Sequence, residues 1–181
     1  MPPAEPRAVK LASGEREVSG KRASRPATIP RMTSTRRAAA GDARACADIQ
    51  IAAMRGAMPW LPDLHTDDET RAWMRDVVFA TREVWVAEET GRVAAFVAIE
   101  SELVGNLYVA PSSQGRGLGS ALLDVVKRER PGGFRLWVFQ RNARARAFYD
   151  ARGLVLVETT DGRANEEREP DALYAWTPKS G

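Results

Sequence analysis

A glycine-rich segment with the composition of an anion-binding loop lies past the middle of this 181-residue chain. Residues 107–120 read LYVAPSSQGRGLGS: an apolar strand end passes through a turn at Pro111 and Ser112 into alternating glycines, and a helical pattern follows. Such a loop directs consecutive backbone N–H groups and the positive end of a helix dipole at one place. The segment therefore predicts a phosphate group as its ligand.

The glycine spacing separates three possible ligands. A nucleotide P-loop needs Lys and then Ser or Thr after its last glycine, whereas Ser120 and Ala121 follow Gly119. A dinucleotide loop reads G-x-G-x-x-G, but these glycines alternate as G-x-G-x-G. What remains is Gln or Arg, two residues, Gly, one residue, then Gly or Ala, which Gln114, Gly117 and Gly119 match. This pattern resembles the coenzyme A loop of the GNAT N-acetyltransferase superfamily, with a ligand-free helix entry as the alternative.

A second segment resembles the same superfamily. Residues 142–149 read NARARAFY, and Asn142, Ala145, Phe148 and Tyr149 fit the N-x-x-A-x-x-[FL]-Y helix that follows the fifth strand in that family. The two matches stand in the expected order, and the resemblance extends over roughly residues 33–177. The chain is thus identified as a member of the GNAT superfamily, which implies an acetyl-CoA-dependent N-acetyltransferase with acetyl-CoA as cosubstrate.

The resemblance implies how the cosubstrate binds. Backbone N–H groups of residues 114–120 are expected to hold the pyrophosphate, and the backbones of Leu107 and Val109 to bond the pantetheine amides as a neighbouring strand would. Arg116 either adds charge or is solvated, and Asn142 either caps its helix or contacts coenzyme A. The expected cosubstrate-binding residues are Leu107, Tyr108, Val109, Gln114, Gly115, Arg116, Gly117, Leu118, Gly119, Ser120, Asn142 and Tyr149. No metal site is expected, because one His and one Cys cannot form a closed cluster.

Tyr149 is the expected proton donor to the departing thiolate. It follows Asn142 by two helical turns on the same face, or roughly 10 Å at 1.5 Å per residue. A phenol with a pKa near ~10 suits a thiolate whose thiol has a pKa near ~8.5. The alternative is a packed tyrosine whose hydroxyl meets only water or backbone.

The need for a general base depends on the acceptor amine. A lysine amine with a pKa of ~10.4 is neutral only about once in 2,500 molecules at pH 7, which costs ~4.6 kcal/mol, whereas an α-amine costs about 1 kcal/mol. Glu100 and Glu102 stand at the start of the fourth strand, where relatives often carry a catalytic carboxylate. A solvated pair is the alternative. Some relatives that acetylate protein N-termini carry a glutamate in the fifth strand, five residues before the asparagine. Trp137 stands at that position here, which weakens the interpretation as an N-terminal acetyltransferase.

Hydrophobic periodicity predicts an α/β (α+β) domain of alternating helices and strands. The resemblance adds a mixed, mostly antiparallel sheet with helices on both faces, whose fourth and fifth strands run parallel and splay apart to receive the pantetheine arm. The expected helices are 42–53 capped by Asp42, 66–79 opened by a Thr66–Glu69 capping box, 118–130 and 142–152. The expected strands are 34–38, 84–88, 92–99, 102–109, 134–139, 154–159 and 173–176.

Charge divides the chain into two parts. The formal net charge is +3, but residues 1–32 hold seven basic and three acidic groups, which leaves 20 basic and 21 acidic groups in the other 149 residues. Residues 1–32 are therefore predicted to be a disordered basic extension, with Met32 as a candidate translational start, and 33–178 to be a single GNAT-like domain. A near-neutral domain gives little support for nucleic-acid binding.

Partners and location follow from composition. The longest uncharged apolar run, 93–99, is too short to span a bilayer, so no membrane partner is expected. The single cysteine, Cys46, and the lack of an apolar secretory segment favour a cytoplasmic protein, monomeric or homodimeric, in which Cys46 is buried and inert. Two segments are candidate walls for the acceptor, a small-molecule or peptide amine: the loop 58–65, which holds the only histidine, and the acidic run 165–171.

Three functions stay open. The first is acetyl transfer from acetyl-CoA to an amine by direct attack in a ternary complex. The second is a non-catalytic acyl-CoA-binding or sensor module on the same fold, and the third is a nucleic-acid adaptor that uses the basic extension. Turnover with a panel of amines separates the first two, and deletion of residues 1–31 tests the third.

Overall fold

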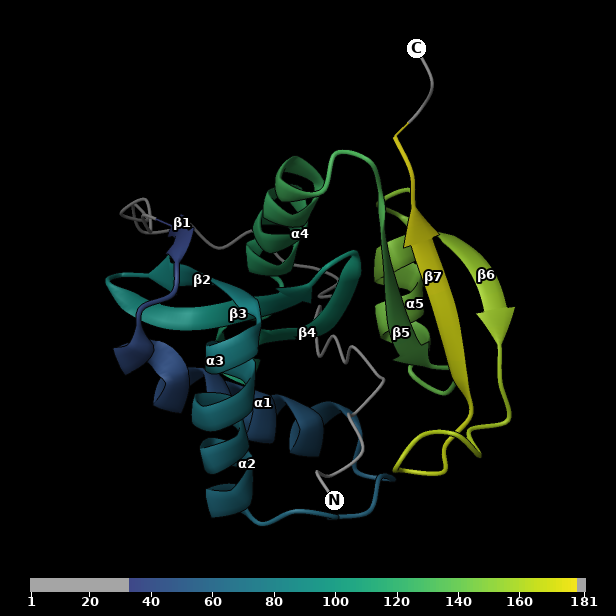
Figure 1. Ribbon diagram of the computed structural model, residues 1–181, viewed down its shortest axis with the longest axis horizontal. Coiled ribbons are helices and arrows are strands. Elements are labelled where there is room, and N and C mark those ends of the chain that lie inside the picture. Colours follow the sequence, from purple (N-terminus) through teal and green to yellow (C-terminus); the bar gives the residue numbers. More distant parts are fainter. Residues whose placement is uncertain (1–32, 179–181) are drawn as a thin grey trace, which may run out of the picture.

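One parallel pair of strands lies within an otherwise antiparallel seven-stranded sheet (Figure 1). The computed structural model describes residues 33–178, so the expectation for 1–32 lies outside the described part of the chain. The strand order is β1-β2-β3-β4-β5-β7-β6, and only β4 and β5 run parallel. The strands are β1 Thr33–Arg37, β2 Glu83–Glu89, β3 Arg92–Glu100, β4 Leu103–Val109, β5 Phe134–Phe139, β6 Val155–Thr159 and β7 Asp171–Trp176. This is the mixed, mostly antiparallel sheet that the sequence predicted.

Helices cover both faces of the sheet. The α-helices are α1 Ala43–Ala57, α2 Asp67–Trp73, α3 Phe79–Thr81, α4 Leu118–Glu129 and α5 Ala143–Asp150, and the short helical turns are η1 Ala40–Asp42, η2 Met74–Val78 and η3 Pro111–Ser113. One core cluster joins α1 and η2 to one face of the sheet. A second cluster joins α4 and α5 to the opposite face. Figure 1 shows α4 and α1 on opposite sides of β2–β4.

Strand β3 shows how the sequence serves both layers. Side chains alternate between the two faces of a strand. Phe96 and Ala98 accordingly belong to the cluster with α1, whereas Val97 and Ile99 belong to the cluster with α4. Because helices cover both faces, the strand is an almost uninterrupted apolar run instead of an alternating one.

Helix α2 begins as predicted, but a π-helical turn follows it. The Thr66 hydroxyl accepts from the Glu69 amide at 3.2 Å, and the Glu69 carboxylate accepts from the Thr66 amide at 2.8 Å, which completes the capping box. The expected helix to residue 79 is interrupted by the π-helical turn η2, after which α3 ends at Thr81.

Asp42 stands at the N-cap position of α1, but the expected capping by its side chain was wrong. It closes the preceding turn η1 with helical backbone angles, and its side chain makes no cap hydrogen bond to α1. Its carboxylate instead accepts from the Ala39 amide at 2.8 Å and pairs with Arg36 at 2.7 Å. The Arg36 guanidinium holds the pKa of Asp42 below its usual range.

The parallel strands share only two residue pairs. Leu103 lies opposite Arg135 and Val104 opposite Leu136, and no later residues of β4 and β5 pair. Strand β4 nevertheless continues to Val109 along β3, and β5 continues to Phe139 along β7. The expected splay between the fourth and fifth strands is therefore present. Within residues 33–178, no helix has the length and apolar character needed to cross a membrane.

Candidate active site

The glycine-rich loop forms an uncapped helix N-terminus. Gly115 and Gly117 have φ angles of 74° and 82°, in the left-handed region that favours glycine. Helix α4 starts at Leu118, and no side chain caps it at Gly117. The first N–H groups of a helix have no intrahelical acceptor, so this end presents donors and a positive dipole to a ligand.

A cavity of about 310 Å³ lies between this loop and α5. Its lining includes Gly115, Gly117 and the first turn of α4 on one side, and Arg144 and Arg152 from α5 and its end on the other. The two arginines are its only charged lining residues among those the structure describes. Nε of Arg152 donates to the Ser120 hydroxyl at 3.0 Å, which holds the guanidinium against the start of α4. The cavity therefore suits an anionic ligand.

The edge of β4 offers backbone groups to the gap beside it. The Ala110 amide donates to the Ala94 carbonyl of β3 at 2.8 Å. Because backbone groups alternate in direction along a strand, the amides of Leu107 and Val109 face away from β3. The Val109 carbonyl accepts from Nε2 of Gln114 at 3.3 Å, so the Gln114 side chain covers one acceptor of this edge.

Tyr149 carries a buried hydroxyl that has no hydrogen-bond partner among residues 33–178. The side chain is fully buried in the cluster that holds Leu107 and Val109. Its ring centroid lies 5.3 Å from that of Phe148 and 6.0 Å from that of Tyr174. Burial raises the pKa of the Tyr149 hydroxyl well above its ordinary value, so the group stays protonated. An orphaned buried donor is uncommon, and it favours a ligand atom as the missing partner.

Asn142 caps α5. Its Oδ1 accepts from the Ala145 amide at 3.1 Å, and its Nδ2 lies 3.7 Å from Sδ of Met58. The side chain is buried and does not line the cavity beside α5. Of the two roles open from the sequence, the structure shows the cap; a contact with coenzyme A stays a prediction.

Arg116 is bound by a carboxylate that the sequence did not single out. Its Nη1 lies 2.7 Å from both carboxylate oxygens of Glu89, and the same carboxylate accepts from the Ser113 hydroxyl at 2.9 Å. Glu89 ends β2, one residue beyond the strand 84–88 that the sequence predicts. No local pattern marks it, because its partners lie 24 and 27 residues away.

Glu100 and Glu102 lie at the paired end of β4. Glu100 pairs with Arg82 at 3.1 Å, and Glu102 is exposed in the turn between β3 and β4. The Glu102 carbonyl accepts from the Arg135 amide at 2.8 Å, where β4 and β5 are still joined. Neither carboxylate lines the two cavities described here, and a role as general base stays a prediction.

A second cavity of about 370 Å³ lies on the other face of β4. Asn106 and Tyr108 of β4 form its floor, and the remaining lining comes from α1, α2 and the two loops expected to wall the acceptor. The charged lining residues are Arg55, Asp63, Asp67, Glu69, Glu166 and Glu167, with His65 beside them. Five carboxylates face one arginine, so this cavity is acidic where the first is basic.

A hydrogen-bonding contact joins the two acceptor-side loops. Nε2 of His65 lies 2.9 Å from Oε1 of Glu166, and 101 residues separate them in the sequence. The 58–65 loop and the 165–171 run are therefore brought together, as expected for two walls of one site.

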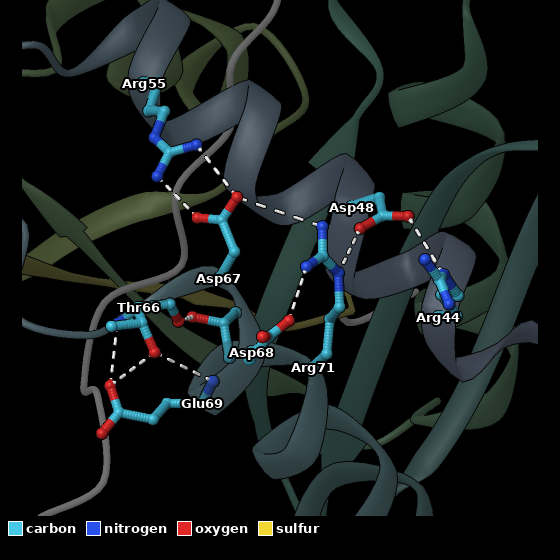
Figure 2. A network of polar contacts seen from close by, with 9 residues as sticks. Arg44, Asp48, Arg55, Thr66, Asp67, Asp68, Glu69 and Arg71 are labelled. Atoms are coloured by element: carbon cyan, nitrogen blue, oxygen red, sulfur yellow. Dashed lines mark hydrogen bonds and ion pairs between the residues drawn. The ribbon is translucent and has the colours of Figure 1, made fainter.

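A polar network fixes the helical wall of this cavity (Figure 2). Arg55 on α1 pairs with Asp67 at 2.6 Å, and Arg71 on α2 reaches back to Asp48 on α1 at 2.8 Å and to Asp68 at 2.9 Å. The Arg55 guanidinium holds the pKa of Asp67 below its usual range. None of the residues of α2 is buried, and these charged contacts attach α2 to α1.

Strand β4 contributes a residue to each cavity: Tyr108 lines the acidic one and Val109 the basic one. Burial raises the pKa of Tyr108 well above its ordinary value, and the negative charge of Glu167 and the Tyr149 hydroxyl add to the effect. Tyr108 lies in the cluster with α1 and Tyr149 in the cluster with α5. Within the described residues, no group of three or more His, Cys, Asp or Glu side chains could hold a metal ion.

Comparison with known proteins agrees with this geometry. The model of the acetyltransferase (GNAT) domain family matches residues 80–153. The chain is 34% identical over 104 residues to the peptidyl-lysine N-acetyltransferase YiaC of Escherichia coli (strain K12), covering 57% of this chain and 69% of that protein. The chain therefore belongs to the GNAT acetyltransferase family.

Two solved structures share the fold. Apo-form YjaB of Escherichia coli superposes with a TM-score of 0.67 at 18% identity, covering 80% of this chain and 97% of that one. The acetyltransferase-fold protein yncA of Salmonella typhimurium, solved with its cofactor acetyl-CoA, gives a TM-score of 0.64 at 19% identity, covering 82% and 96%. The family match includes the glycine-rich loop, α4, β5 and α5, which are the elements that surround the basic cavity.

Proposed function

We propose that the protein transfers the acetyl group of acetyl-CoA to a primary amine by direct attack in a ternary complex. The observation that carries the proposal is the pair of cavities on either side of β4, one basic beside an uncapped helix and one acidic. An anionic cosubstrate fits the first and a cationic acceptor the second. The gap beside β4 lets the two reach each other.

In this proposal, the glycine-rich loop holds the pyrophosphate of acetyl-CoA. The N–H groups at the start of α4 donate to the phosphate oxygens, and Arg144 and Arg152 supply positive charge. The amides of Leu107 and Val109 bond the pantetheine arm as a strand partner would. Gln114 must release the Val109 carbonyl if that acceptor is also used.

The chemistry needs a proton donor and a proton acceptor. The neutral amine nitrogen attacks the thioester carbon, and a new C–N bond forms as the C–S bond breaks. Tyr149 donates its proton to the departing sulfur, which gives the free thiol of coenzyme A. The attacking nitrogen releases one proton, which restores the Tyr149 phenol directly or through water and cavity carboxylates. A buried phenol with a raised pKa is protonated at neutral pH but is a weaker acid than a free phenol, so its donation depends on the negative charge that develops on the departing sulfur.

We infer that the acceptor is a lysine side chain of a peptide. The five lining carboxylates favour a cationic amine on approach. The similar Escherichia coli protein is named a peptidyl-lysine N-acetyltransferase. Neutralising such an amine costs ~4.6 kcal/mol at pH 7. Glu166 and Glu167 line the acceptor cavity and are better placed than Glu100 or Glu102 to take up its proton.

A panel of three peptides tests the acceptor. One has a blocked N-terminus and a single lysine, the second has a free N-terminus and no lysine, and the third has neither amine. With acetyl-CoA supplied, mass spectrometry should find acetylation of the first peptide only. Turnover confined to the second would contradict the lysine acceptor. Tight acetyl-CoA binding without acetylation of any amine would instead show a non-catalytic binding module.

A further inference from the structure

We propose that Glu89 is a positioning residue for the coenzyme A loop and that Arg116 serves as its internal counter-ion and does not bind phosphate. The proposal rests on the proposed binding of acetyl-CoA beside α4. It assigns a role in cosubstrate binding to a carboxylate at the end of β2, outside the glycine-rich motif.

The contacts of Glu89 lie on either side of Gly115, one of the two left-handed glycines of the loop. Its carboxylate accepts from the Ser113 hydroxyl at 2.9 Å and from Nη1 of Arg116 at 2.7 Å to each oxygen. Gly115 lies between these two anchors, and Gly117 follows them directly before α4. The hairpin end is itself fixed, because Glu89 is paired with Arg92 across the β2–β3 hairpin and with Thr33 of β1.

Such a tether answers a specific need of this loop. Glycine loses more conformational freedom on folding than any other residue, so a loop with two left-handed glycines is costly to hold in one shape. Hydrogen bonds to a charged carboxylate are the stronger kind, and here they attach the loop to a sheet edge. The loop amides therefore face the cavity before any ligand binds, which lowers the entropy lost on binding.

The geometry also separates Arg116 from the ligand site. Gly115 and Gly117 line the basic cavity, whereas Arg116 between them does not. Glu89 is only 9% exposed, so its charge needs a partner close by. Arg116 supplies such a partner and offsets a negative charge that repels phosphate. The cations that face the cavity are Arg144 and Arg152.

Calorimetric titration with acetyl-CoA gives the test, because the two roles of Arg116 predict opposite signs. Glu89→Gln should weaken acetyl-CoA binding by about three- to tenfold, since neutral hydrogen bonds replace charged ones. At saturating acetyl-CoA, kcat should stay within about twofold. If Arg116 were a phosphate ligand restrained by Glu89, the same substitution would free it and tighten binding, which would overturn the proposal.

A double-mutant cycle sharpens the assignment. Arg116→Gln should weaken binding more than Glu89→Gln does, by about ten- to a hundredfold, because it removes the positive charge that Arg116 holds 2.7 Å from the buried Glu89 carboxylate, near the proposed phosphate site. The double variant Glu89→Gln/Arg116→Gln should then bind better than Arg116→Gln alone. A double variant that binds no better than Arg116→Gln would contradict the internal pair.

Glu88→Gln is the matched control. Glu88 is the adjacent residue of β2, and its carboxylate pairs with Arg36 at 2.7 Å, away from the loop. This variant should change the melting temperature without changing the Kd for acetyl-CoA. Glu89→Gln with a lowered melting temperature and an unchanged Kd would show a merely structural role and overturn the proposal.

Two further arms keep the outcomes distinct. Should Glu89→Gln fail to fold, Ser113→Ala removes one anchor without a charge change and should still weaken binding by about twofold or more; no effect on Kd would contradict the tether. If the parent protein binds acetyl-CoA but no anchor variant alters its Kd, only the role of Glu89 fails. A parent protein that does not bind acetyl-CoA overturns the proposed function as well.

Discussion

Val104 of β4 lies opposite Leu136 of β5, and this is the last residue pair that the two strands share. Beyond it, β4 keeps its pairing with β3 up to Val109, while β5 keeps its pairing with β7 up to Phe139. Within residues 33–178, the sheet therefore divides into two halves that are joined only by the two residue pairs between β4 and β5. The separation leaves the amides of Leu107 and Val109 unpaired with β5. The side chains of these two residues belong to the same core cluster as Tyr149.

Tyr149→Phe should lower kcat by about ten- to a thousandfold and leave the Kd for acetyl-CoA nearly unchanged, because general acids typically contribute factors of about 10²–10⁴. Phenylalanine keeps the ring contacts with Phe148 and Tyr174. The hydroxyl has no partner among the described residues, so its removal should not lower the melting temperature. Steady-state kinetics with a slow peptide acceptor measures the effect. A variant as fast as the parent, with chemistry limiting the rate, would show that Tyr149 only packs.

Alkaline pH should destabilise the protein through its buried tyrosines. Burial raises the pKa of Tyr108 and of Tyr149, whereas tyrosines of the unfolded chain ionise near pH ~10. As pH rises, the unfolded state therefore loses these protons before the folded state does. The contribution of the two tyrosines to the free energy of unfolding is complete below about pH 10 and decreases above it. Each such group contributes about 1.4 kcal/mol per pH unit. Urea unfolding at several alkaline pH values should show a shallower fall for Tyr149→Phe; parallel curves would refute a raised pKa.

Gly119→Asp should abolish acetyl-CoA binding while the fold persists. Gly119 is the buried second residue of α4 and lines the basic cavity, so a carboxylate there meets the phosphate. The first turn of a helix otherwise favours Asp, which preserves the helix itself. Gly132→Asp is the control, because an added Cβ meets no atom within 4 Å at that exposed glycine. Calorimetry should find binding to the control alone, and full affinity of Gly119→Asp would remove the loop from the site.

Asn142→Ala should cost about 1 kcal/mol of stability, the usual price of a lost helix cap. Asn142→Asp keeps an oxygen that can accept from the Ala145 amide and should retain most of that stability. Urea unfolding measures both variants, and acetyl-CoA titration follows alongside. If alanine instead left stability unchanged and weakened binding, Asn142 would be a ligand of coenzyme A more than a cap.

The sequence predicted the elements whose signals are local. Helix α4 has a legible apolar stripe, of which Leu122, Val125 and Val126 are buried, and β5 was predicted with the bounds that the structure shows. The capping box at Thr66 is equally local, since its two hydrogen bonds span three residues. The predicted capping of α1 by the Asp42 side chain was wrong because a short turn precedes α1 and the Asp42 carboxylate pairs with Arg36, six residues earlier.

The site was predicted only as far as its motifs extend. The glycine-rich loop and Tyr149 were found because a short pattern holds their spacing. Glu89 and the cavity arginine Arg152 carry no such signal, since their contacts join segments 24 to 32 residues apart. The candidate general base was likewise predicted from local sequence position alone. Glu100 and Glu102 stand at the expected strand start, but Glu166 and Glu167, which line the acceptor cavity, come from a loop whose position depends on the whole fold.

Hydrogen exchange with and without acetyl-CoA tests the central claim most directly, namely that acetyl-CoA binds between β4 and α5 beside the start of α4. Mass spectrometry of proteolytic peptides should show ligand-dependent protection in residues 107–120 and 143–152, and none in β1 or β6. Loss of the protection in Gly119→Asp would confirm its origin. Protection confined to other segments, or no change on adding saturating acetyl-CoA, would contradict the account.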